Sequence, residues 1–148
     1  MPAERPPHAA ESGQRALRYV AAALILVGGL VHLKLYDDGY KDVPDQNLGR
    51  SFLLNAAASV VIAVALVATR HLLVLLAGLV LVNGTLLAFA LSRGPGIFGF
   101  TETGWNPSPE AAIALVCEIA AAVLLLVLLA PKRTVPRPAA TSPSVEEA

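Results

Sequence analysis

The chain has 148 residues, of which 55% are hydrophobic and 15% charged, and its formal net charge is zero. A soluble domain averages roughly 25% charged residues, so this deficit in charge indicates a surface that faces lipid. Zero net charge gives no basis for a nucleic-acid partner, and the single cysteine, Cys117, excludes an intrachain disulfide and a cysteine-based zinc cluster.

Four apolar segments follow one another along the chain, and each is long enough to cross a bilayer as an α-helix. A transmembrane helix needs about 20 mostly apolar residues, because each residue rises about 1.5 Å through roughly 30 Å of hydrocarbon. The first segment has Arg18 and Lys34 near its ends, and the fourth contains one internal charge, Glu118. The sequence predicts spans at about 17–36, 51–69, 72–92 and 110–130.

The two ends of the chain are rich in proline, small residues and charge. Such segments bury too little apolar surface to offset the loss of chain entropy. We therefore expect a disordered tail at 1–16, a four-helix transmembrane domain at 17–130 and a second disordered tail at 131–148. The second and third spans are joined by Arg70 and His71 alone, which forces them into an antiparallel hairpin.

The lysines and arginines outside the apolar segments are unevenly distributed between the two sides of the membrane. Positive residues are enriched in cytoplasmic loops. Seven lie on the side of the two termini and four on the side of the first and third loops: Arg5, Arg15, Arg18, Arg70, Lys132, Arg133 and Arg137 against Lys34, Lys41, Arg50 and Arg93. We expect an all-α four-helix transmembrane bundle, a multi-pass protein of the cell membrane with both termini in the cytoplasm.

Each span contains at least one polar side chain that is costly to place in hydrocarbon. Glu118 lies on a stripe of small residues in span four, and such stripes mark helix contacts in membranes, so it should point into the bundle. His32 and Tyr36 share one face of span one. Asn55 and Asn83 lie in spans two and three. These five residues are the candidates for a polar pocket or an interhelical network.

Two interpretations of this group stay open. Interhelical hydrogen bonds in membranes contribute only about 1 kcal/mol each, and buried polar groups usually find partners whether or not they bind a ligand. The structural interpretation is therefore favoured for the group as a whole. For Glu118 alone the functional one is favoured, because a carboxylate costs more to bury than an amide.

Several chemistries find no support in the residues. His32 and His71 lie near opposite faces of the membrane and cannot share one haem iron. The sequence contains no G-x-S-x-G, H-E-x-x-H, phosphate-binding loop or C-x-x-C motif. No cofactor or metal is identified, and the sequence leaves enzymatic activity undecided while favouring a non-catalytic role.

A resemblance rests on the run at 28–36 (GGLVHLKLY), on Tyr40 and on the run at 49–55 (GRSFLLN). These residues resemble a group of small, uncharacterised four-span membrane proteins of high-GC actinobacteria. There, a His-Leu-x-Leu-Tyr stretch ends span one and a Phe-Leu-Leu-Asn stretch opens span two. The group is loosely similar to DoxX-like four-helix membrane proteins, some of which are associated with redox systems. The resemblance covers about residues 17–130 and implies a fold, but no catalytic residues.

Three functions are compatible with the sequence. The leading expectation is a structural or accessory subunit, whose outer loops dock a membrane protein partner or another copy of the chain. The second is a DoxX-like, redox-associated protein that binds a small molecule, quinone or metal ion in an outward polar pocket. The third is a small proton-coupled transporter using Glu118, which is disfavoured because no inverted repeat or second intramembrane charge is visible.

The position of Glu118 separates these three functions. A scaffold predicts that its carboxyl is bonded to His32 or Asn83 in a dry core. A binding protein predicts a cavity lined by the polar group. A transporter predicts a water path from Glu118 to both faces of the membrane.

Overall fold

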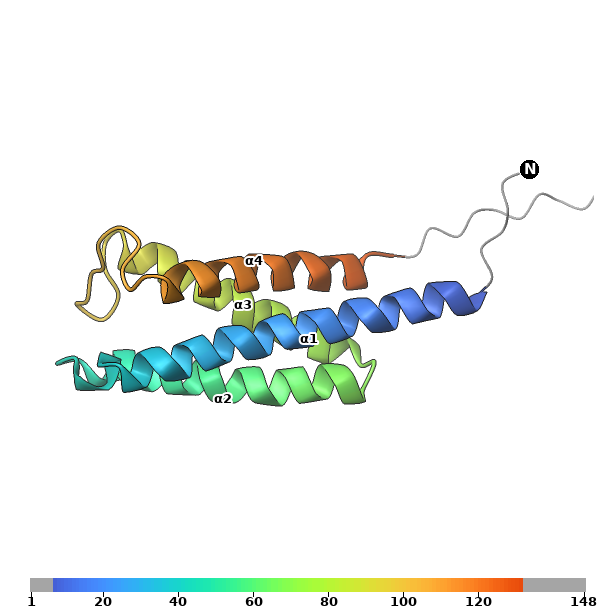
Figure 1. Cartoon of the computed structure of the whole chain (residues 1–148), viewed down its shortest axis with the longest axis horizontal. Coiled ribbons are helices and arrows are strands. Elements are labelled where there is room, and N and C mark those ends of the chain that lie inside the picture. Colours follow the sequence, from blue (N-terminus) through green and yellow to red (C-terminus); the bar gives the residue numbers. More distant parts are fainter. Residues whose placement is uncertain (1–6, 132–148) are drawn as a thin grey trace, which may run out of the picture.

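Four long helices make up most of residues 7–131, the part of the chain that the computed structural model describes. They are α1 (Pro7–Asp37), α2 (Gln46–Ala68), α3 (Leu72–Ser92) and α4 (Glu110–Leu129), with a short 3₁₀ helix, η1 (Tyr40–Asp42), between α1 and α2. No strand occurs within these described residues. The helices run along one common long axis (Figure 1), which confirms the predicted all-α four-helix bundle.

The two ends of the bundle differ in what they carry. The α1–α2 and α3–α4 connections lie at one end, which we call the loop end (Figure 1). The beginning of α1, the end of α4 and the short α2–α3 connection lie at the opposite end, which we call the terminal end. Both ends of the helical domain therefore fall on the same side, as an even number of spans requires.

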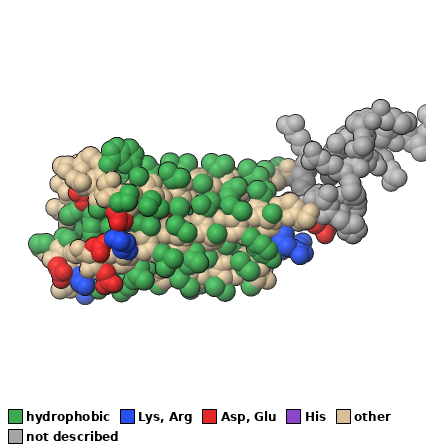
Figure 2. Space-filling view, in the orientation of Figure 1, with side chains coloured by type: hydrophobic (Ala, Val, Ile, Leu, Met, Phe, Trp, Pro, Cys, Tyr) green, Lys and Arg blue, Asp and Glu red, His purple; other side chains and the backbone are tan. Residues whose placement is uncertain are grey.

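The surface of the bundle is that of a membrane protein. All four helices are long and apolar enough to cross a bilayer. In Figure 2 the charged side chains gather near the two ends, and the face between them is mostly hydrophobic. Large apolar side chains such as Leu54, Val61 and Val80 are more than half exposed along this belt. A soluble monomer rarely exposes so large an apolar area, so the chain is a multi-pass membrane protein.

The helix limits agree with the predicted spans for α3 and nearly so for α4, and differ at the start of α1 and α2. Helix α1 begins at Pro7, so residues 7–16 are helix and not part of a disordered tail as predicted. Pro7 is the first helical residue, a position at which proline favours a helix start. The residues after it extend a helix that is already nucleated in the span. Residues 1–6 and 132–148, the rest of the predicted tails, lie outside the described residues.

Helix α2 begins at Gln46, five residues before the predicted span. The side chain of Asp45 caps it by accepting a hydrogen bond from the backbone N–H of Asn47 at 2.8 Å. Such a cap satisfies one of the free N–H groups at a helix start. The first loop is consequently shorter than predicted, and η1 fills part of it.

The tightly packed core occupies the part of the bundle toward the terminal end. Alanines on three helices bring the backbones close together there, as small residues do in membrane bundles. At the same end, the guanidinium of Arg18 donates to the carbonyl of Leu66 in the last turn of α2. The buried members of this core are Ala21, Ala22, Ile25, Ala63, Leu66, Val82, Ala121 and Leu125.

Helices α1 and α2 lie very close to each other at Gly29, opposite Ser59. A Cβ atom placed on Gly29 would lie only 2.4 Å from the Cβ of Ser59, a distance that real atoms do not adopt. Ser59 is itself only 1% exposed, so it has no room to move away. Glycine is therefore required at 29 by packing, and the crossing of these two helices depends on it.

We expect Gly29→Ala to lower the free energy of unfolding by about 1–3 kcal/mol, because the added methyl overpacks the α1–α2 contact. Gly84→Ala is the matched control, since a Cβ at Gly84 meets no atom within 4 Å. It should leave stability unchanged or raise it by up to about 1 kcal/mol through helix propensity. Titration with SDS, followed by circular dichroism, measures both. Equal stability of the two variants would contradict the close contact.

Candidate functional site

A cavity of about 510 Å³ lies in the part of the bundle toward the loop end. All four helices line it, together with η1 and the α3–α4 connection, and most of its lining is apolar. Its volume falls within the roughly 300–1,000 Å³ of pockets that hold small molecules. The bundle is thus closely packed toward one end and hollow toward the other.

The cavity exists because α3 changes neighbours along its length. It starts beside the end of α2 and reaches the loop end beside the start of α4 (Figure 1), so α2 and α3 diverge. Several of the positions that line this space, on three helices, carry small residues and leave it unfilled. They are Ala58, Gly84, Ala88, Ala111 and Ala114.

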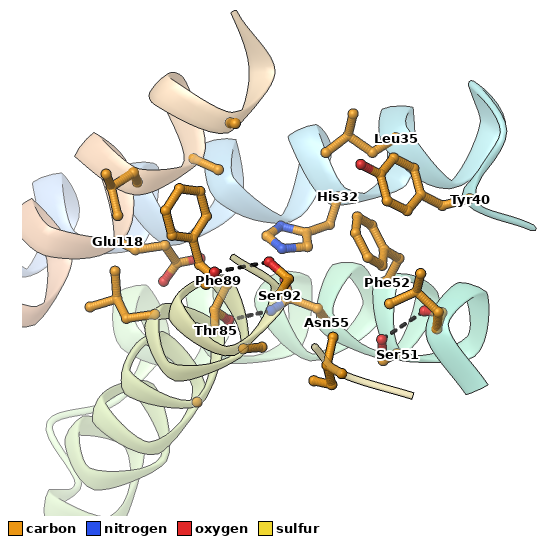
Figure 3. A pocket seen from close by; sticks show the side chains of 18 of the residues that line it. His32, Leu35, Tyr40, Ser51, Phe52, Asn55, Thr85, Phe89, Ser92 and Glu118 are labelled. Atoms are coloured by element: carbon orange, nitrogen blue, oxygen red, sulfur yellow. Dashed lines mark hydrogen bonds between the residues drawn. The ribbon is translucent and has the colours of Figure 1, made fainter. Parts of the chain in front are cut away.

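Glu118 of α4 contributes a buried carboxyl to the cavity wall. It is only 4% exposed, and its Oε2 atom has no hydrogen-bond partner among the residues that the structure describes. Its Oε1 atom lies against α1, where a Cβ placed on Gly28 would come within 3.0 Å of it. The absence of a side chain at Gly28 therefore makes room for the carboxyl. Figure 3 shows Glu118 directed into the same space as His32.

The ring of His32 is held in one orientation by its own helix. Its Nδ1 atom lies 2.8 Å from the carbonyl oxygen of Gly28. Because a carbonyl only accepts, Nδ1 carries the hydrogen and donates it, which leaves Nε2 of a neutral ring as an acceptor. The ring also packs against the ring of Phe52, at 5.2 Å between centroids. His32 can thus accept a hydrogen bond at the cavity.

A hydrogen bond across the cavity wall joins α2 to α3. The Nδ2 atom of Asn55 donates to the hydroxyl of Thr85 at 2.6 Å (Figure 3). Thr85 donates in turn to the carbonyl of Leu81 at 3.0 Å. The hydroxyl of Ser59 donates to the Oδ1 atom of Asn55 at 3.4 Å. Asn55 is thereby tied to both helices, in the region where they begin to separate.

The structure brings together three of the five predicted site residues: His32, Asn55 and Glu118 line the cavity. Asn83 is exposed and donates to the carbonyl of Leu79 on its own helix at 2.8 Å. Tyr36 is half-buried beside Gly49 at the start of α2. Neither Tyr36 nor Asn83 lines the cavity.

On α3, the polar side chain that lines the cavity is Thr85 and not Asn83 as predicted. Two residues along an α-helix correspond to about 200°, so the side chains of residues 83 and 85 point to nearly opposite faces. The sequence contains both polar residues in a uniformly apolar span, and nothing in its pattern selects the inward one. The prediction of Asn83 was wrong because its amide is satisfied at the surface by its bond to Leu79.

A cluster at the loop end that the sequence analysis did not assign covers the cavity. We call Tyr40, Phe52, Phe100 and Glu102 the cap. The hydroxyl of Tyr40 donates to the carboxylate of Glu102 at 2.8 Å, which joins the first loop to the third. The ring of Tyr40 stacks on Phe52 at 4.6 Å and meets the edge of Phe100 at 5.6 Å. These contacts link residues up to 62 positions apart, which no local pattern could indicate.

Arg93 fastens the third loop to the end of α3. Its guanidinium donates to the carbonyls of Gly104 at 3.1 Å and Asn106 at 2.7 Å, and to the hydroxyl of Ser92 at 2.9 Å. It also lies 3.6 Å from the ring centroid of Phe89. The positive charge of Arg93 is thus engaged in holding the loop that carries Phe100 and Glu102.

The site combines an apolar chamber with a few hydrogen-bonding groups: a carboxyl, an imidazole acceptor and an amide. Such a combination suits an organic molecule with one polar part. Among residues 7–131, no three His, Cys, Asp or Glu side chains come together to hold a metal ion. Comparisons with family models, with curated proteins and with solved structures found no match to this chain.

We expect Asn55→Ala to lower the free energy of unfolding by about 0.5–2 kcal/mol, the range of interhelical hydrogen bonds in membranes. Asn83→Ala is the matched control and should change it by less than about 0.5 kcal/mol, because Asn83 bonds only to its own helix. A double-mutant cycle with Thr85→Ala isolates the α2–α3 bond. An equal loss in both asparagine variants would argue against this assignment.

The cap should depend on pH through Tyr40. Burial, and then the hydrogen bond to Glu102, raise the pKa of its hydroxyl above the ordinary value. Since the folded protein holds this proton more tightly than the unfolded chain, the stabilisation is complete below pH about 10 and declines as pH rises further. The difference in tyrosinate absorbance between wild type and Tyr40→Phe measures the shift. A Tyr40 that ionised at or below pH about 10 would contradict a closed cap.

Proposed function

We propose that the protein binds a small amphipathic organic molecule in the loop-end cavity, with the polar part of the molecule held by Glu118, His32 and Asn55. The observation that carries this proposal is the Oε2 atom of Glu118, which is buried at the wall of a ligand-sized cavity and has no partner among the described residues. This function was the second of the three expected from the sequence.

The scaffold role is less well supported by the contacts of Glu118. A carboxyl that only locked the bundle would be bonded to a neighbouring helix, because an unsatisfied buried polar group costs about 1–3 kcal/mol or more. His32 could have been the hydrogen-bond donor to Glu118, but it donates its Nδ1 hydrogen to the carbonyl of Gly28 instead. Asn55 is engaged with Thr85 and Ser59. The carboxyl is therefore costly to keep unless something else binds it.

The lining indicates what kind of molecule would fit. Aromatic rings of Tyr40, Phe52 and Phe89 face the cavity together with aliphatic side chains. Aromatic pairs prefer offset or edge-to-face contacts and so favour a flat, unsaturated ligand. A quinone has such a ring and carbonyl oxygens that accept hydrogen bonds from an amide or a protonated carboxyl. Redox association of the DoxX-like kind would follow if the ligand is a quinone.

A docking role of the loop end is the second candidate. Phe98 is 46% exposed and Trp105 61% exposed, and both lie on the third loop, which Arg93 holds in place. Aromatic residues are enriched both at membrane interfaces and at the centres of protein contacts. An accessory subunit that presents this loop to a membrane protein partner or to a second copy remains compatible with the cavity.

The first experiment purifies wild type, Glu118→Gln and Asn83→Ala in mild detergent and extracts each for mass spectrometry. We expect wild type and Asn83→Ala to retain the same organic molecule. We expect Glu118→Gln to retain about tenfold less, equivalent to about 1.4 kcal/mol of binding free energy. Circular dichroism checks that all three remain helical. Asn83 is a suitable control because it is exposed and does not line the cavity.

Two results would overturn the proposal. One is that all three variants retain the same molecules in the same amounts, so that Glu118 has no part in retention. The other is that wild type retains nothing specific while Glu118→Gln unfolds more easily by about 1–3 kcal/mol. The second result would mean that Glu118 has a structural role, and the third loop would become the candidate functional surface.

A further inference from the structure

We infer that the ligand enters the cavity sideways from the bilayer, through a gap between α2 and α3, and is therefore a lipid-soluble amphiphile with a neutral polar head. This inference rests on the proposed function and adds to it a route and a chemical class. The evidence for it comes from residues of α2 and α3 on the lipid-facing side of the cavity, and not from Glu118, His32 and Asn55.

The lateral wall of the cavity is open to the lipid-facing surface. Leu54 of α2 and Val80 of α3 both line the cavity, yet they are 71% and 74% exposed. Gly84 also lines it and is exposed, and a Cβ placed there would meet no atom within 4 Å. The same residues thus face both the chamber and the surroundings, which is what a portal between two helices requires.

The portal lies below the loop-end limits of the helices, at the same level as Glu118. Leu54 is eight residues from the loop-end limit of α2 (54 − 46), and Gly84 is eight from that of α3 (92 − 84). Glu118 is also eight residues from the start of α4 (118 − 110). At about 1.5 Å per residue, all three lie roughly 12 Å inside the helix ends. A molecule that passes the portal arrives at the level of the carboxyl.

The residues of the cap line the cavity at the loop end, between its interior and water. The ring of Tyr40 stacks on Phe52 and meets the edge of Phe100, and its hydroxyl is bonded to Glu102. The backbone N–H of Glu102 also donates to the carbonyl of Ser92 at 2.7 Å, which anchors the cap to the end of α3. An aqueous solute would have to break these contacts, whereas a lipid-phase molecule meets Leu54, Val80 and the open face of Gly84, beside the Asn55–Thr85 bond.

The charges around the chamber favour a neutral head. Glu118 is the only buried Asp, Glu, Lys or Arg side chain among residues 11–131, where burial is described. The nearby cation, Arg93, is engaged with two loop carbonyls and Ser92. A charged head would therefore enter a low-dielectric chamber with one carboxyl as its only buried ionisable partner, and the cost of desolvating both charges can exceed what their pairing returns. A hydroxyl or carbonyl head can bond to Glu118, His32 or Asn55 while the chain of the molecule extends through the portal.

The test uses hexadecanol with a photoactivatable diazirine in its chain, and butanol with a diazirine as a water-soluble probe with the same head. Full-length protein is reconstituted in phosphatidylcholine vesicles, each probe is added, and labelled peptides are mapped by mass spectrometry over time after mixing. Gly84→Phe blocks the portal. Ala90→Phe is the matched control, because Ala90 is exposed on the same helix and does not line the cavity. Gly84→Leu replaces Gly84→Phe if the latter does not fold.

We expect hexadecanol to label α2 and α3 at the portal in wild type and in Ala90→Phe. Gly84→Phe should slow this labelling by about tenfold, a barrier change of about 1.4 kcal/mol. Hexadecylamine and hexadecanoic acid probes should label less than hexadecanol. Glu118→Gln should reduce the final extent of labelling, because it removes the bond to the head.

The outcomes separate failure of the route from failure of the site. If Gly84→Phe and wild type label at the same rate while Glu118→Gln labels less, the cavity binds the probe but the lateral route is wrong. If the charged probes label more strongly than hexadecanol, the neutral-head assignment is wrong. If no probe labels wild type above Glu118→Gln, the proposed function itself fails.

Discussion

The contact of Gly29 in α1 with Ser59 in α2 determines much of the remaining architecture. Because glycine lets the two backbones approach so closely, α1 and α2 form a tightly packed pair. The short α2–α3 connection starts α3 beside α2, and α3 then leaves it to pack against α4. One close helix pair and one divergent pair produce a bundle that is dense toward the terminal end and hollow toward the loop end.

The two parts of the bundle have different physical roles. Toward the terminal end, alanines and branched aliphatic residues fill the space between helices, and this packing supplies the stability of the bundle. Toward the loop end, small residues line a chamber that carries the one buried carboxyl among the described residues. Removing polar groups from the hollow part costs some stability, but the packed part can hold the helices together. Such a division allows a binding site without loss of the fold.

In the chamber, the imidazole and the amide already have hydrogen-bond partners. His32 is bonded to Gly28 and Asn55 to Thr85, which fixes their orientation toward the cavity. Glu118 is the exception, and Gly28 provides the space for its carboxyl. Preorganised donors and acceptors around one unsatisfied group are typical of binding sites, because the cost of ordering them is met before the ligand arrives.

The sequence by itself determined the number of helices, the antiparallel order, the membrane environment and the inward direction of Glu118. These follow from the length of the apolar runs and from the period of small residues along one helix. Only the tertiary structure decided that Thr85 and not Asn83 faces inward, that Tyr40 reaches Glu102, and that α2 and α3 separate. The physical reason is that rotation and divergence of an apolar helix are decided by its neighbours, since a span that is apolar all round has no amphipathic face to orient it.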